Sequence, residues 1–151
     1  MIRVQEEDFD ADAEIAALTA GKKTIGGVTT FTGLVREMAP VNGLDQPIRA
    51  ITLEHYPGMT EKKLAEIEAE ANRRWPLDAS LIIHRHGRLV PGDRIVLVAC
   101  ASAHRQAAFE ACQFLMDWLK TDAPFWKLED TKVGGVLALT WRGWLGEEQE
   151  H

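Results

Sequence analysis

The sequence predicts an α+β fold in which an antiparallel or mixed sheet packs against helices. Two stretches, Leu81–Arg88 and Arg94–Ser102, have the pattern of strands, and the Pro-Gly-Asp sequence at 91–93 supplies the turn chemistry of a hairpin between them. Residues Ile95–Cys100 are apolar at consecutive positions, which predicts a central strand covered on both faces. The sheet therefore needs a layer of helices, and the sequence offers three.

The N-terminal part of the chain predicts a helix, a strand and a loop. The helix covers Asp10–Thr19, because acidic residues fill its first turn and Gly21 follows its end. The strand covers Ile25–Thr32, which is rich in β-branched residues. The segment Met38–Pro47 holds two prolines, an asparagine and a glycine, which is typical of a mobile loop.

The middle of the chain predicts a strand and a second helix. The strand pattern resumes at Ile48–His55 and stops before the Pro-Gly pair at 57–58. Thr60 is placed to cap the helix, and Pro76 ends it. The apolar stripe of this helix consists of Leu64, Ile67, Ala71 and Trp75.

A third helix and a last strand complete the predicted elements. Ser102 is placed to cap the helix, which cannot continue through Pro124. Residues Val136–Trp141 form the last strand. The apolar stripe of the third helix consists of Ala108, Ala111, Cys112, Leu115 and Leu119.

The composition is that of one soluble domain covering residues 1–151. Hydrophobic residues make up 46% of the chain and charged residues 26%, which is ordinary globular usage. No segment is both apolar and long enough to cross a bilayer. The N-terminal segment is acidic where a secretory signal would be basic and then apolar, so we expect the protein in the cytoplasm.

Charge and cysteine usage exclude several classes of site. A net charge of -6 argues against a nucleic-acid partner, because binding to phosphates rests on clustered Lys and Arg. Cys100 and Cys112 lack the spacing of zinc ligands and are expected to be buried free thiols. His84 and His86 share a strand face but have no evident third ligand, so we expect no metal, and no cofactor is called for.

Basic side chains lie at both ends of the predicted third helix and just beyond it. His104 and Arg105 fall in its first turn, where unpaired N–H groups and the helix dipole attract an anion such as phosphate. Lys120 lies in its last turn, and Lys127 follows a Pro-Phe-Trp segment whose apolar surface can desolvate an amine for proton transfer or nucleophilic attack. In an acidic chain this grouping predicts one local anion site with reactive amines.

Each of these residues also has a plainer interpretation. A lysine at a helix C-terminus stabilises the dipole by roughly 0.3–1 kcal/mol without any further role. A lysine beside aromatic residues, such as Lys127, commonly lays its aliphatic stem on the apolar surface and extends its amine to water. Basic side chains at a helix start, such as those of His104 and Arg105, can simply be solvated. Arg36, at the end of a strand, either makes a forked contact with a bound carboxylate or phosphate or is a solvated loop arginine.

Five blocks stand in order along the chain: TFTGLVR at 30–36, LEHYPGM at 53–59, HRHGRLVPGD at 84–93, SAHR at 102–105 and LKTDAPFWK at 119–127. Together they resemble the large, catalytic subunit of molybdopterin synthase, the MoaE family. The last block is the most specific. The likeness covers most of the chain, but the segment beyond Glu129 matches the family only loosely.

The resemblance implies an α/β-hammerhead-like fold and a sulfur-transferring enzyme. It implies a homodimer of large subunits with a small ubiquitin-like sulfur-carrier subunit at each end, which makes a heterotetramer. The C-terminal Gly-Gly tail of the carrier, ending in a thiocarboxylate, would enter a pocket of the large subunit and meet cyclic pyranopterin monophosphate. Two sulfurs would then be transferred to build the dithiolene of molybdopterin.

The resemblance also assigns the site. Lys120 and Lys127 would carry the catalysis, either by moving protons or by transient covalent capture. An arginine of the neighbouring subunit, from the loosely matching segment beyond Glu129, would complete the pocket, and Arg142 is a candidate whose role the resemblance leaves open. The residues that would line the pterin and phosphate site are Leu34, Val35, Arg36, His104, Arg105, Leu128 and Glu129.

Two non-catalytic functions compete with this interpretation. One is a regulatory module that binds a phosphorylated small molecule at the His104–Arg105 helix start. The other is a scaffold that only holds the small subunit through the aromatic pair Phe125 and Trp126. Sulfur-transfer activity separates the enzyme from both.

Overall fold

The computed structural model describes residues 1–37, 50–133 and 136–143. Within these residues the chain forms three helices and eight strands. In chain order they are β1 (Ile2–Gln5), α1 (Ala11–Thr19), β2 (Gly27–Leu34), β3 (Ala50–His55), α2 (Met59–Arg74), β4 (Leu77–Arg85), β5 (Gly87–Leu89), β6 (Arg94–Ser102), α3 (Arg105–Thr121), β7 (Phe125–Val133) and β8 (Val136–Gly143).

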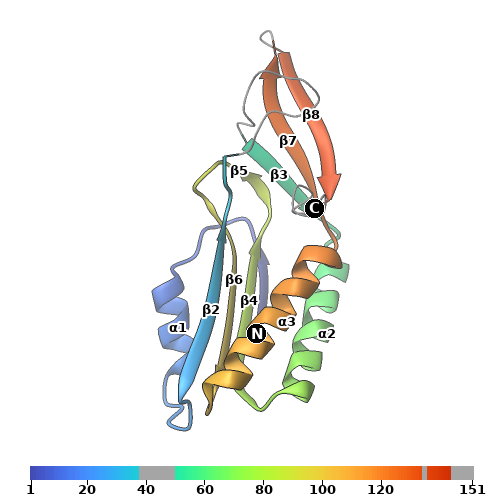
Figure 1. The fold of residues 1–151 in the computed structure, drawn as a ribbon. Coiled ribbons are helices and arrows are strands. Elements are labelled where there is room, and N and C mark those ends of the chain that lie inside the picture. The colour runs from blue at the N-terminus through green and yellow to red at the C-terminus, as the bar shows by residue number, and fades with distance from the viewer. Residues whose placement is uncertain (38–49, 134–135, 144–151) are drawn as a thin grey trace.

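The strands form two four-stranded sheets (Figure 1). The first sheet has the order β1-β4-β6-β2, with β1 parallel to β4 and the other neighbours antiparallel. The second sheet has the order β5-β3-β7-β8 and is antiparallel throughout. Figure 1 shows the second sheet beyond the end of the first, with α1 on one side of the first sheet and α2 and α3 on the other. The predicted α+β class with mixed and antiparallel sheets is confirmed.

Helices on both faces explain why β6 is apolar at every position from Ile95 to Ala101. Successive side chains of a strand point to opposite faces. Leu97 and Ala99 join the smaller core cluster with Leu18 of α1, whereas Val98 and Cys100 join the larger cluster with the residues of α2 and α3. The prediction of a central strand covered on both faces is confirmed, since all residues from Ile95 to Ser102 are buried.

The third helix packs on the first sheet through the predicted stripe. Ala108, Ala111, Cys112, Leu115 and Leu119 are all buried. At roughly 25 cal/mol per Å² of apolar area, the burial of such a stripe is the main stabilising term for a helix of this kind. Among the described residues no helix is long and apolar enough to cross a membrane.

The two predicted hydroxyl caps are wrong. Helix α2 begins after Gly58, and Thr60 lies inside its first turn, where the buried Thr60 hydroxyl donates to the Tyr56 carbonyl at 2.9 Å. Helix α3 has His104 as its N-cap, and the hydroxyl of Ser102 donates instead to the Pro76 carbonyl at 2.8 Å. Both hydroxyls donate hydrogen bonds to backbone carbonyls outside the helix that each was predicted to cap. The local sequence pattern of a capping residue does not reveal such bonds. Asp10, in contrast, does cap α1 by accepting from the N–H of Ala13 at 3.1 Å.

The two strands of the predicted hairpin do pair, but a third strand lies between them in the chain. Strands β4 and β6 pair antiparallel, yet β4 ends at Arg85 and the predicted strand Leu81–Arg88 breaks there. Gly87 has φ +89°, a left-handed conformation that favours glycine, and the chain then forms β5. Because β5 pairs with β3, the connection crosses from the first sheet to the second.

The sequence analysis did not identify β1 or β7. Strand β1 lies parallel to β4 at the sheet edge, and its start is fixed by the N-terminal ammonium of Met1, which contacts the Glu68 carboxylate and donates to the Ser80 carbonyl at 2.9 Å. The predicted last strand, Val136–Trp141, is confirmed as β8. The predicted loop at Met38–Pro47 lies outside the described residues.

Stacked histidines lie where the two sheets meet. The His84 ring of β4 stacks on Phe125 of β7, with centroids 3.8 Å apart and planes 16° from parallel. The His55 ring of β3 lies 4.5 Å from the His86 ring and 5.8 Å from Phe125. Burial lowers the pKa of His84 to about 4, and burial together with the charge of His86 lowers the pKa of His55. His84 and His55 are therefore neutral imidazoles at neutral pH.

We expect the junction to make stability depend on pH. His84 has a pKa of about 4 in the folded chain and about 6.5 when unfolded, so its contribution is complete above pH 6.5 and is lost as the pH falls to 4. The loss amounts to about 3 kcal/mol of unfolding free energy at most. Urea denaturation between pH 7 and pH 4 measures it. His84→Phe keeps the ring stack and should reduce the slope, with His55 supplying the remainder; an unchanged slope contradicts the assignment.

Candidate functional site

Helix α3 separates the predicted basic residues into two groups. His104 and Arg105 stand at its first turn and Lys120 in its last. Fifteen residues at the helical rise place Arg105 and Lys120 about 22 Å apart. Within one chain these residues therefore form two separate groups, and the prediction that they share one anion site stays a prediction that needs a second copy of the chain. Each end must be considered as a site of its own.

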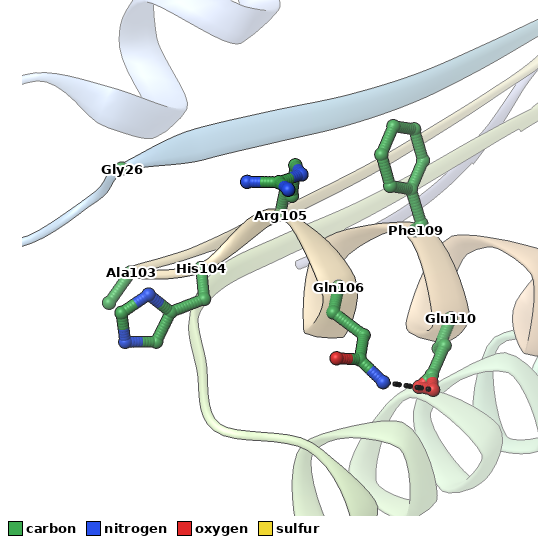
Figure 2. A pocket seen from close by; sticks show the side chains of 7 residues that line it. All are labelled: Gly26, Ala103, His104, Arg105, Gln106, Phe109 and Glu110. Atoms are coloured by element: carbon green, nitrogen blue, oxygen red, sulfur yellow. Dashed lines mark hydrogen bonds between the residues drawn. The ribbon is translucent and has the colours of Figure 1, made fainter.

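An open hollow of about 610 Å³ lies at the start of α3 (Figure 2). Its side chains include one imidazole and one guanidinium, which can bind an anion, and one carboxylate, which makes the hollow mixed in charge. Gln106 donates to the Glu110 carboxylate at 3.3 Å, which keeps that acid next to the amide (Figure 2). The lining residues are Gly26, Ala103, His104, Arg105, Gln106, Phe109 and Glu110.

Close backbone approach shapes this hollow. The N–H of Gly26 donates to the Ser102 carbonyl at 2.9 Å, which draws the start of β2 against the segment before α3. A Cβ at Gly26 would lie 2.1 Å from the Ala103 carbonyl oxygen. Only glycine allows this approach, so Gly26 fixes one wall of the hollow.

Lys120 lines a second cavity, of about 280 Å³, between α3 and β2. The wall from β2 is formed by Thr29, Thr30 and Phe31, and the α3 wall includes Cys112 and Met116. One carboxylate, that of Asp117, also lines it. The half-buried position of Lys120 places an amine where it can meet a small molecule in the cavity.

Lys127 is buried in the second sheet. Only 2% of its surface is exposed. It pairs with Leu53 of β3, a core residue, and it shares a strand face with Phe125, which also belongs to the core. A surface lysine that extends to water would be exposed, so the plainer interpretation of Lys127 does not fit the structure.

The residues from Leu34 to Arg36 divide between surface and core. Leu34 and Arg36 are exposed at the end of β2. Val35 is buried in the main cluster, its N–H donates to the Asp93 carbonyl at 2.8 Å, and its own carbonyl accepts from Gly92 at 2.7 Å. Leu34 and Arg36 can reach a ligand directly, whereas Val35 holds their backbone in place.

Three more predicted residues lie on the second sheet. Leu128 is half-buried and follows Lys127, so its side chain lies on the opposite face. The side chain of Glu129 lies outside the described part of the structure. The backbone of β8 places Arg142 in register with Lys127 of the same chain. No group of His, Cys, Asp or Glu within residues 1–37, 50–133 and 136–143 could hold a metal ion.

Sequence reasoning missed the apolar surface beside the site. Phe109 is 60% exposed on α3 and lines both hollows, and Phe31 is 43% exposed on the neighbouring strand β2. The signal was present, because Phe109 lies outside the buried stripe of an amphipathic helix. Phe109 and Phe31 line the same cavity, and an exposed pair of this kind marks a candidate interaction surface.

Comparison with known proteins identifies the chain's relatives. Residues 4–122 match the family model described as MoaE protein. The chain is 55% identical over 133 residues to the molybdopterin synthase catalytic subunit of Mesorhizobium japonicum, covering 88% of this chain and 80% of the relative. It is 56% identical over 133 residues to the same subunit of Pseudomonas aeruginosa, covering 88% and 86% of the two chains.

Solved structures agree with these relatives. Molybdopterin cofactor biosynthesis protein E from Burkholderia multivorans is 50% identical and superimposes with a TM-score of 0.76, covering 95% of this chain and 88% of the other. Molybdopterin synthase from Staphylococcus aureus is 31% identical, with a TM-score of 0.79 and coverage of 93% and 96%. A chain in the complex of subunits 1 and 2 of molybdopterin-converting factor from Helicobacter pylori has the same fold, at 18% identity and a TM-score of 0.71, covering 92% of this chain and 89% of the other.

We expect Gly26→Ala to destabilise the start of α3. Its new Cβ meets the Ala103 carbonyl, and overpacking of this kind costs about 1–3 kcal/mol of unfolding free energy. Gly27→Ala is the matched control, because a Cβ there would lie 3.9 Å from its nearest atom, an ordinary contact. Urea denaturation of the two variants measures the difference. Equal midpoints for Gly26→Ala and Gly27→Ala would show that close approach at Gly26 does not matter.

Proposed function

The chain belongs to the MoaE family of molybdopterin synthase catalytic subunits, which act in molybdenum cofactor biosynthesis, and on that premise we propose its detailed reaction and site. The reaction transfers two sulfurs from the thiocarboxylated C-terminus of a small ubiquitin-like carrier to cyclic pyranopterin monophosphate. The product is the dithiolene of molybdopterin. No metal or cofactor takes part in this proposal, and the reaction takes place in the cytoplasm.

The burial of Lys127 is the observation that carries the proposal. The carrier tail and the cyclic phosphate are both anions, and an acidic protein of net charge -6 repels them at long range. Bringing them together requires fixed positive charge in a place that water does not screen. Lys127, which is 2% exposed, places an amine where water does not reach it, and Lys120 places another at the wall of its cavity.

The two lysines act on the reacting centre. Lys120 and Lys127 either exchange protons as the cyclic phosphate opens and sulfur is added, or one of them captures the carrier carbonyl covalently for a short time. Arg36, Leu34, Leu128 and Glu129 line the pterin side, with Val35 supporting the first two. His104 and Arg105 bind phosphate.

The partner that supplies sulfur is the small carrier subunit. Its Gly-Gly tail enters the cavity that Lys120 lines, and the cysteines of this chain are not needed as sulfur donors. The complex of subunits 1 and 2 of the Helicobacter pylori factor, which has the same fold, supports a pairing of this kind. With one carrier at each end of a dimer, the active form is a heterotetramer.

We further propose that a second copy of the chain completes the site. Arg105 and Lys120 are about 22 Å apart along one helix, too far for one small ligand to touch both. A two-fold dimer that sets two α3 helices antiparallel brings Arg105 of one copy to Lys120 of the other. The exposed aromatic residues Phe31 and Phe109 lie beside the cavities and favour this face for contact.

Removal of either amine should abolish the chemistry. We expect Lys120→Ala and Lys127→Ala to reduce the rate of molybdopterin formation at least about 100-fold, the usual effect of losing a group that moves protons or stabilises charge in the transition state. The assay combines the purified chain, thiocarboxylated carrier and cyclic pyranopterin monophosphate. Lys63→Ala is the control, because Lys63 is an exposed lysine on α2, away from both cavities.

Wild-type rates in Lys120→Ala would overturn the catalytic assignment of that residue. Saturable binding of the pterin phosphate with no product from the wild-type chain would favour the regulatory module instead.

Mixing two inactive variants tests the composite site. We expect Lys120→Ala and Arg105→Ala each to be impaired alone, and a one-to-one mixture, after subunit exchange, to recover about a quarter of wild-type activity. Half of the dimers are then mixed, and each mixed dimer holds one intact site out of two. If the mixture is no more active than the mean of its components, both residues act within one chain or not in one site.

A further inference from the structure

The only two cysteines of the chain lie against each other beneath the Lys120 cavity. Cys100 is on the central strand β6 and is fully buried, and Cys112 is on α3 with 5% of its surface exposed. Both belong to the main core cluster, and their thiols interact with each other, which shifts the pKa of both. They therefore join α3 to the sheet at one point of the interface.

Only one of the two thiols has access to a small molecule. Cys112 lines the 280 Å³ cavity together with Lys120, two helical turns further along α3. Cys100 lies one layer deeper, in register with Thr29 of β2, which also lines the cavity. A reagent of the size of one or two water molecules can enter a cavity of this volume.

The interaction between the two thiols makes their pKa values unequal. The interaction with Cys100 lowers the pKa of Cys112, whereas the interaction with Cys112 and burial raise the pKa of Cys100. The thiolate is the reactive form of cysteine. Cys112 is thus the nucleophile that faces the cavity, and Cys100 is the protonated thiol behind it.

We propose that Cys112 and Cys100 form an oxidation site for small hydroperoxides at the floor of the Lys120 cavity. The Cys112 thiolate attacks the peroxide oxygen, the O–O bond breaks, and Cys112 becomes a sulfenic acid while hydroxide or alkoxide leaves. The Cys100 thiol then attacks the sulfenic sulfur, and the intramolecular disulfide forms with loss of one water. The peroxide is reduced and the two thiols are oxidised.

The disulfide would change the cavity above it. Its geometry requires the two Cα atoms to stand about 4.4–6.8 Å apart, which fixes the position of α3 on β6. Lys120 lies on the same face of α3 as Cys112, since eight residues correspond to slightly more than two turns. Oxidation should therefore lower sulfur-transfer activity, and this consequence rests on the proposed function, whereas the thiol chemistry does not.

The experiment treats the purified full-length chain with hydrogen peroxide and analyses it by intact mass, by peptide mapping and with dimedone, which traps sulfenic acids. We expect the wild-type chain to lose two hydrogen atoms, to show a Cys100–Cys112 cross-linked peptide, and to return to its starting mass with dithiothreitol. Cys100→Ala should stop at the sulfenic acid, gaining one oxygen atom without dimedone and, when dimedone is present, one dimedone group in place of that oxygen with loss of water. Cys112→Ala should leave Cys100 unreacted.

Wild-type mapping does not depend on either variant being folded, and Cys100→Ser and Cys112→Ser serve as second variants if an alanine variant unfolds. The proposal is wrong if the wild-type chain shows no cross-link, if its cross-links join different chains, or if Cys100 reacts in Cys112→Ala as fast as Cys112 reacts in Cys100→Ala. If the cross-linked chain keeps full synthase activity, the proposed effect of the disulfide on the Lys120 cavity is wrong. Absence of activity in the reduced wild-type chain counts against the proposed function alone.

Discussion

The packing of α3 on the first sheet is the contact on which the rest of the molecule depends. Its buried stripe, from Ala108 to Leu119, fixes the axis of the helix and so fixes what stands at each end. One end presents His104 and Arg105 beside Gly26, and the other presents Lys120 above β2. The helix is rigid, so these two groups keep their separation in any state of the folded chain.

The second sheet supplies the buried lysine, Lys127, which helix α3 does not carry. Strand β7 follows α3 after three residues and pairs with β3, and this pairing buries Lys127 next to core residues. Burying an amine is costly unless its surroundings compensate, so a buried lysine is a candidate functional residue. In the proposed reaction, this amine would help to bring two anions together, and the proposed dimer would join the two ends of α3 in one site.

The sequence predicted the elements that depend on local pattern. The apolar run of β6 and the stripe of α3 gave the correct sheet and helix layers, because periodicity reports burial directly. The caps at Thr60 and Ser102 were wrong, because their hydroxyls bond to distant or preceding carbonyls. Strand β7 was missed because it pairs with β3, which lies 70 residues earlier in the chain, and its buried Lys127 gives no apolar pattern that a local reading could use. The separation of Arg105 from Lys120 followed from helix geometry alone and could have been predicted.

The most direct test of this account is a crystal structure of the chain bound to its carrier with an intact Gly-Gly tail. The account predicts that the terminal glycine lies within hydrogen-bonding reach of Lys120 or Lys127 Nζ, with Arg105 of a second copy facing the same cavity. A tail that ends on another face, with both amines remote from its terminal carbon, would contradict it.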